Sequence, residues 1–135
     1  MEYVFIVGCQ RSGTTLAGQI LGAHSQAVLI DENHGVYAFI DALLAEDESQ
    51  DAIFSKCLDK ARKSYVEDGR FDADGGLAPH VTHVILKAPN ATYDFEQFRT
   101  LNKPNFHFVY MVRDARDVIC SMQRLVHIPM VDNQV

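Results

Sequence analysis

Short apolar runs alternate with segments in which apolar residues recur at helical spacing. Residues 4–7 form a β-rich, continuous apolar run, which predicts a strand covered on both faces. Similar runs predict three further strands, over residues 27–30, 81–86 and 106–112. Helical spacing predicts helices over residues 14–23, 36–44, 51–66 and 95–101, and a last helix that follows the sequence RDARD.

This order of elements determines the fold class that we expect. Strands that alternate with helices are joined by right-handed crossovers and form a mainly parallel sheet. We therefore expect an α/β fold with three α/β/α layers around a sheet of about four strands. The 135 residues have the length of a single domain, and the polar, glycine-bearing stretch 67–79 is expected to be a loop.

Net charge and cysteine content limit the ligands that the protein is expected to bind and the compartment in which it is expected to lie. The net charge of -6 argues against a general nucleic-acid binder, which needs a basic face. The three cysteines are widely spaced and form no C-x-x-C pair, which favours reduced thiols over a disulfide framework or a zinc site. No signal peptide is recognisable, and no apolar run approaches the ~18 residues of a membrane span. We expect a cytoplasmic protein that binds neither nucleic acid nor membrane.

The stretch IVGCQRSGTTL carries the strongest chemical signal. Gly8 and Gly13 lie five residues apart where a strand passes into a helix, as in the phosphate-binding P-loop G-x-x-x-x-G-K-[ST]. Thr14 stands in place of the lysine, and Arg11 lies inside the turn. Backbone N–H groups at a helix start attract anions, threonine hydroxyls can add donors, and an arginine can grip an oxygen-rich group with two bonds. The sheet is therefore expected to be P-loop-like and to bind an anion.

The same stretch, FIVGCQRSGTTL, resembles the 5′-phosphosulfate loop of sulfotransferases that use 3′-phosphoadenosine-5′-phosphosulfate (PAPS). Loops of that family carry lysine or arginine before S-G-T-T, and Arg11 occupies this place, although Gln10 replaces the usual proline. The resemblance implies that the loop binds the phosphosulfate through Gly8, Gln10, Arg11, Ser12, Gly13, Thr14 and Thr15.

A second motif, FVYMVRDARDVICSMQRL, resembles the 3′-phosphate motif of the same family. Arg113 follows a strand, and Ser121 lies eight residues later on the next helix. The resemblance implies that these two residues bind the 3′-phosphate of PAPS. Taken alone, the segment also fits a helix capped by Asp114 or Asp117 with ion pairs to Arg116.

Transfer of a sulfuryl group needs a base for the acceptor's proton and cations for the developing charge. Arg11 is the candidate cation. Glu32 matches a glutamate that serves as base in tyrosyl-protein and related sulfotransferases, with His34 and Asp31 as rivals. Lys87 resembles the lysine of a K-x-P motif in bacterial members, and it either contacts the sulfuryl group or acceptor or is a solvent-facing residue at a strand end.

The resemblance implies a sulfotransferase that moves a sulfuryl group from PAPS to a hydroxyl or amine, releases 3′,5′-adenosine bisphosphate (PAP) and needs no metal. The acceptor is not identified, and a homo-oligomer is possible. One alternative is a P-loop kinase or NTPase, because AVLIDE also fits a Walker B strand in which Asp31 organises Mg²⁺.

A second alternative follows from length. The resemblance covers residues 4–125, and family domains are commonly longer. We expect residues 1–135 to be a single sulfotransferase-like domain, the cofactor-binding N-terminal portion without the usual C-terminal part. Such a domain could also bind the nucleotide without turnover.

Overall fold

A computed structural model gives the fold, and the structure describes residues 1–65 and 68–126. The strands are β1 (Glu2–Gly8), β2 (Ala27–Ile30), β3 (His83–Lys87) and β4 (Phe106–Met111). The α-helices are α1 (Thr14–Gly22), α2 (Val36–Leu44), α3 (Gln50–Ala61), α4 (Phe95–Leu101) and α5 (Ala115–Val126). Three short 3-10 helices are η1 (Glu32–His34), η2 (Arg62–Tyr65) and η3 (Pro89–Asp94).

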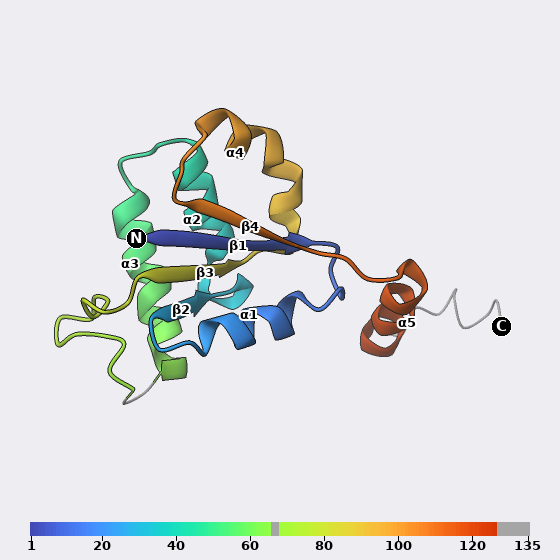
Figure 1. Ribbon diagram of the computed structural model, residues 1–135, viewed down its shortest axis with the longest axis horizontal. Coiled ribbons are helices and arrows are strands. Elements are labelled where there is room, and N and C mark those ends of the chain that lie inside the picture. The colour runs from blue at the N-terminus through green and yellow to red at the C-terminus, as the bar shows by residue number, and fades with distance from the viewer. Residues whose placement is uncertain (66–67, 127–135) are drawn as a thin grey trace.

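The four strands form one parallel sheet in the order β2-β3-β1-β4 (Figure 1). All strands run in one direction, so the segments that follow them meet at one edge of the sheet. Helix α5 stands beyond this edge, past the ends of β1 and β4 (Figure 1). Ligands of open α/β sheets bind at this edge, where the strand order reverses.

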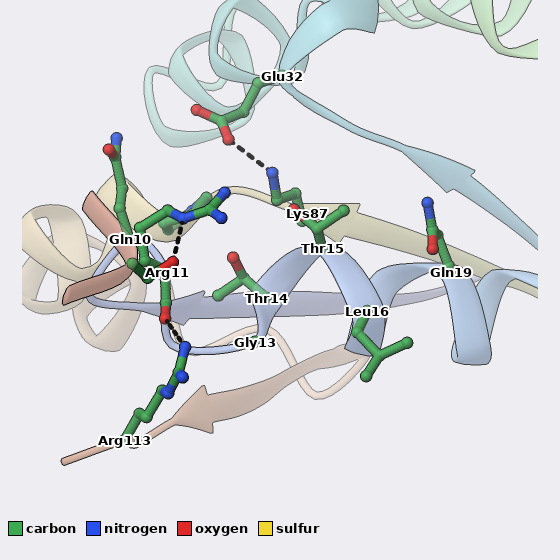
Figure 2. Close-up of a pocket in the computed structure, with 12 residues that line it drawn as sticks. Gln10, Arg11, Gly13, Thr14, Thr15, Leu16, Gln19, Glu32, Lys87 and Arg113 are labelled. Atoms are coloured by element: carbon green, nitrogen blue, oxygen red, sulfur yellow. Dashed lines mark hydrogen bonds and ion pairs between the residues drawn. The ribbon is translucent and has the colours of Figure 1, made fainter. Parts of the chain in front are cut away.

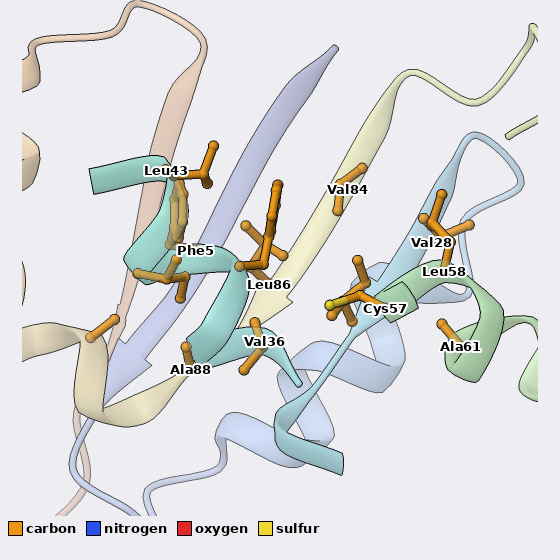
Figure 3. Packing of buried hydrophobic residues seen from close by; sticks show 14 of the residues in the cluster. Phe5, Val28, Val36, Leu43, Cys57, Leu58, Ala61, Val84, Leu86 and Ala88 are labelled. Carbon is orange, nitrogen blue, oxygen red and sulfur yellow. The ribbon is translucent and has the colours of Figure 1, made fainter. Parts of the chain in front are cut away.

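The larger hydrophobic core lies between one face of the sheet and helices α2, α3 and α4 (Figure 3). Its sheet side consists of alternate residues of three strands: Phe5 and Val7, Val28 and Ile30, Val84 and Leu86. On the opposite face, α1 covers a smaller cluster around Ile6, Ala27 and Ile85. The predicted three-layer α/β/α fold with a parallel sheet is confirmed.

Helix α1 packs against the sheet through small residues. Its apolar side chains Leu16 and Ile20 are 62% and 63% exposed, whereas Gly18 is buried. A Cβ atom at Gly18 would lie 3.2 Å from the Leu29 side chain and 3.4 Å from Cβ of Lys87. The close approach brings the first turn of α1 beside the end of β3, which is where the predicted chemistry converges.

Two features differ from a simple interpretation of the apolar pattern. The run that forms β4 is continuous, yet β4 is an edge strand and Tyr110 is 61% exposed. The predicted helix over 51–66 ends as α3 at Ala61 and continues as η2 to Tyr65, and residue 66 lies outside the described residues. The expected loop over residues 67–79 contains an isolated antiparallel bridge between Phe71 and Leu77. Within the described ranges, no helix is both long and apolar enough to cross a membrane.

Candidate active site

A cavity of about 520 Å³ opens at the carboxyl ends of the strands (Figure 2). This volume lies within the ~300–1,000 Å³ typical of small-ligand pockets. The loop after β1 and the first turns of α1 form one wall, and the residues from later segments are Glu32, Lys87, Pro89, Arg113 and Ser121. Nine of the eleven predicted site residues line this cavity, and the other two, Gly8 and Ser12, lie at the end of β1 and in the loop after it. The segments from which the sequence predicted chemistry are therefore brought together.

The loop after β1 has a backbone that requires glycine at both ends. Gly8 has φ of 135°, and a Cβ atom there would lie 2.5 Å from the carbonyl oxygen of Met111. Gly13 has φ of 97° and precedes α1 without supplying a side-chain cap. Between them, the buried Ser12 hydroxyl donates to the carbonyl of Cys9. The first N–H groups of α1 have no partner within the helix, so together with the helix dipole they can hold an anion.

Arg11 joins the two predicted anion sites. Its Nε donates to Oγ of Ser121 at 2.9 Å, and Nη1 of Arg113 donates to the Arg11 carbonyl oxygen at 2.9 Å (Figure 2). Arg11 has φ of 64°, a left-handed conformation that is uncommon for a non-glycine residue. Among the described residues, no carboxylate lies within ion-pair distance of either guanidinium. The loop after β1 and the segment between β4 and α5 therefore present two exposed cations, Arg11 and Arg113, whose remaining donors face solvent.

The predicted base and the predicted lysine are in direct contact. Nζ of Lys87 lies 2.8 Å from Oε1 of Glu32, with 14% of the lysine and 33% of the glutamate side chain exposed. The ends of β3 and β2 supply these residues, and Figure 2 shows the two side chains pointing toward each other. Of the two interpretations left open for Lys87, its place in the cavity wall favours a functional residue over a solvent-facing one.

The rivals of Glu32 stabilise its helix instead of lining the cavity. The Asp31 carboxylate accepts from the N–H of Asn33 at 2.8 Å, and Nδ1 of His34 accepts from the N–H of Asp31 at 3.1 Å. These bonds cap η1, and neither side chain is among those that line the cavity. The cap engages Oδ1 of Asp31, the residue that the Walker B alternative assigns to Mg²⁺. Within residues 1–65 and 68–126, no cluster of three metal-ligating side chains is present.

The alternative interpretation of the second motif is compatible with the binding role. Asp114 caps α5 by accepting from the N–H of Arg116 at 2.8 Å, and its carboxylate also pairs with that guanidinium. The Arg116 side chain lowers the pKa of Asp114, more than the backbone bond does. The cap orders the start of α5, and Ser121 lies on the same helix at the cavity.

Sequence reasoning missed four residues of the site, one of which is Pro89, a lining residue at the start of η3. Gln19 lines the cavity four residues after Thr15, a spacing that places both on one side of α1 and could have indicated it. Leu16 lines the cavity between them. Tyr37 donates a hydrogen bond to Oε2 of Glu32 at 3.3 Å, and no sequence motif marks it.

Comparison with known families agrees with this geometry. A sequence model described as "Sulfotransferase family" matches residues 3–133, a range that includes both motifs. The chain belongs to the sulfotransferase family. A search of curated proteins finds no match. The predicted family resemblance is confirmed, and membership supports sulfuryl transfer as the general reaction.

Proposed function

We propose that the cavity binds PAPS and that the protein, acting as a single sulfotransferase-like domain over residues 1–135, transfers the sulfuryl group to a hydroxyl or amine acceptor. One observation carries the proposal. Two arginines without carboxylate partners among the described residues, Arg11 and Arg113, border one cavity in which a carboxylate and a lysine are also paired.

The donor set fits a nucleotide with two separate anionic groups. The loop offers helix N-terminal N–H groups, the Arg11 guanidinium and the Thr15 hydroxyl to one group. Arg113 and Ser121, which come from another segment, offer a guanidinium and a hydroxyl to the other. Each charge-assisted hydrogen bond contributes about 1.5–3 kcal/mol. A Mg²⁺-bound triphosphate fits less well, because Thr14 replaces the P-loop lysine and Asp31 caps η1.

PAPS supplies the sulfuryl group, whose bond to the 5′-phosphate oxygen breaks as a bond to the acceptor oxygen or nitrogen forms. In this proposal Glu32 takes the proton that the acceptor loses. The phosphate oxygen leaves with the bonding electron pair, and Arg11 and the loop N–H groups stabilise its charge. Lys87 lies between Glu32 and α1, where its ammonium can stabilise the equatorial oxygens of the moving group.

Calorimetric titration with PAP, without metal, tests the binding step. We expect wild-type binding and a loss of about tenfold to a hundredfold in affinity for Arg11→Ala and for Arg113→Ala, because each removes charge-assisted bonds. Arg116→Ala is the matched control, since Arg116 lies three residues after Arg113 at the start of α5, pairs with Asp114 and does not line the cavity. Magnesium-dependent ATP binding that is indifferent to Arg113→Ala would contradict the proposal and favour the kinase alternative.

Turnover is tested separately with radiolabelled PAPS and a panel of phenols, sugars and amines. We expect label transfer that Glu32→Gln lowers by about 10²–10⁴-fold, the usual contribution of a general base. PAP binding without transfer to any acceptor class would instead identify a non-catalytic nucleotide-binding domain.

A further inference from the structure

The carboxylate of Glu32 is held by two donors, one on each oxygen. Lys87 donates to Oε1 at 2.8 Å from the cavity side, and Tyr37 donates to Oε2 at 3.3 Å. Lys87 lines the cavity, whereas Tyr37 does not. Tyr37 therefore touches the proposed base without being placed to touch substrate.

The Tyr37 hydroxyl is itself fixed by a backbone group. The N–H of Asn90 donates to the Tyr37 oxygen at 3.2 Å, so the single phenolic proton is left for Glu32. The ring packs against the larger core. Burial raises the pKa of Tyr37, opposed by the Asn90 bond and assisted by the charge of Glu32, which keeps the hydroxyl protonated at neutral pH. The direction of both hydrogen bonds is thereby set.

Two hydrogen bonds, Lys87 to Glu32 and Asn90 to Tyr37, connect the segment after β2 with the segment at the end of β3. Glu32 and Tyr37 follow β2, whereas Lys87 and Asn90 belong to the end of β3 and to η3. The terminal torsion of a glutamate side chain is broad, so a carboxylate held at one oxygen can turn about its last bond. Donors on both oxygens set the plane of the carboxylate and restrict that rotation.

We propose that Tyr37 is a positioning residue that holds Glu32 in the orientation from which it accepts the acceptor's proton, an inference that rests on the proposed role of Glu32 as base. Without the hydroxyl, Oε2 is released and the carboxylate turns relative to Lys87. The Glu32–Lys87 contact then becomes less ordered, and proton transfer loses alignment while donor binding is retained.

The test substitutes Tyr37→Phe, which keeps the buried ring and removes only the hydroxyl. Tyr3→Phe is the matched control, because Tyr3 is another half-buried tyrosine of the same core that packs on Phe39 and Phe106 away from the cavity. Circular dichroism melts verify that both variants fold.

The first measurement needs no turnover. Lysine side-chain NMR of the free protein follows hydrogen exchange at the Lys87 ammonium, with Lys103, 3.9 Å from Glu46, as an internal reference. We expect Tyr37→Phe to accelerate exchange at Lys87 several-fold without changing Lys103, and Tyr3→Phe to change neither. Unchanged exchange at Lys87 overturns the positioning role whether or not the protein transfers sulfuryl groups.

The second measurement separates binding from chemistry. We expect Tyr37→Phe to lower kcat about tenfold while the KM for PAPS and the affinity for PAP stay within about twofold of wild type. A loss of PAP affinity at unchanged kcat overturns the inference, because Tyr37 would then act on the donor site. Failure of the proposed function is recognised independently, since wild type itself would then bind no PAP or transfer no label.

Discussion

An arginine lies beside each end of helix α1, and the two arginines have very different sets of hydrogen-bond partners. At the carboxyl end, Arg70 donates to the carbonyl oxygens of Gly22, Ala23 and Ala27, the latter two at 2.9 Å. Its Nε lies 3.0 Å from a carboxylate oxygen of Asp68, an ion pair without hydrogen-bond alignment. At the amino end, the exposed Arg11 donates one side-chain bond, to Ser121.

The difference separates a structural cation from a binding cation. Arginine has five N–H donors, and Arg70, 12% exposed, uses most of them on protein acceptors at the negative end of a helix dipole. Arg11 sits at the positive end of the same helix, where a second positive charge is unfavourable until an anion arrives. Arg70 is therefore committed to the fold, whereas Arg11 keeps donors for the anion that we propose it binds.

The largest expected effect on stability is that of substituting Arg70. Arg70→Ala removes the guanidinium donor from three carbonyl groups, of which Gly22 keeps the Tyr65 hydroxyl as a donor, and we expect the free energy of unfolding to fall by about 3 kcal/mol. Arg70→Lys restores only part of this, because one ammonium cannot reproduce a planar guanidinium. Denaturant unfolding measures both variants.

Arg62→Ala is the control for that experiment. Arg62 is about half exposed and pairs with Asp59 one turn away, so its loss should change the free energy of unfolding by less than about 0.5 kcal/mol. An Arg70→Ala protein as stable as Arg62→Ala would remove the distinction between the two arginines.

A smaller effect is expected for the tyrosine beside Arg70. The Tyr65 hydroxyl donates to the Gly22 carbonyl at 3.0 Å and accepts from the N–H of Leu29 at 2.8 Å, so Tyr65→Phe should lower the free energy of unfolding by about 1 kcal/mol at pH 8. Burial raises the pKa of Tyr65 above 10, more than the Leu29 bond and the Arg70 charge lower it.

The raised pKa of Tyr65 makes the contribution of its hydroxyl to the free energy of unfolding depend on pH. The unfolded chain releases the Tyr65 proton at lower pH than the folded protein does, so this contribution is present below pH 10 and is lost as pH rises through the folded value. The stability gap between wild type and Tyr65→Phe should therefore narrow between pH 9 and the alkaline limit of folding. A constant gap across this range would show that the hydroxyl does not titrate differently in the two states.

Local patterns predicted most of the fold and most of the residues that line the cavity. The helix over 36–44 and the strand over 27–30 have the predicted bounds, because periodicity and burial agree there. Loop residues such as Gly8 and Arg11 could be singled out because the P-loop-like pattern between a strand and a helix lies in contiguous residues.

What could not be predicted depends on contacts between distant segments. The bond from Arg11 to Ser121 spans 110 residues, and the link from Tyr37 to Asn90 spans 53. The 3-10 helix that turns Glu32 alone into the cavity is three residues long, too short for any periodicity to show. The buried side of α1 is set by close packing at Gly18, which an apolar pattern does not reveal.

The smallest expected effect is at Arg11, and its sign distinguishes the two ends of α1. Arg11→Ala keeps the left-handed backbone strain but removes a positive charge near the helix amino end. We expect the ligand-free protein to gain about 0.3–1 kcal/mol in free energy of unfolding at low salt, an advantage that high salt screens.

Arg99→Ala, in the last turn of α4, should give the opposite sign, because a cation there favours the dipole. With saturating PAP, wild type should become more stable than Arg11→Ala, since wild type binds the anion more tightly and gains more stability from it. If Arg11→Ala instead lowers stability without ligand and PAP leaves that deficit unchanged, Arg11 is a structural residue like Arg70, and the anion site must lie elsewhere along the cavity.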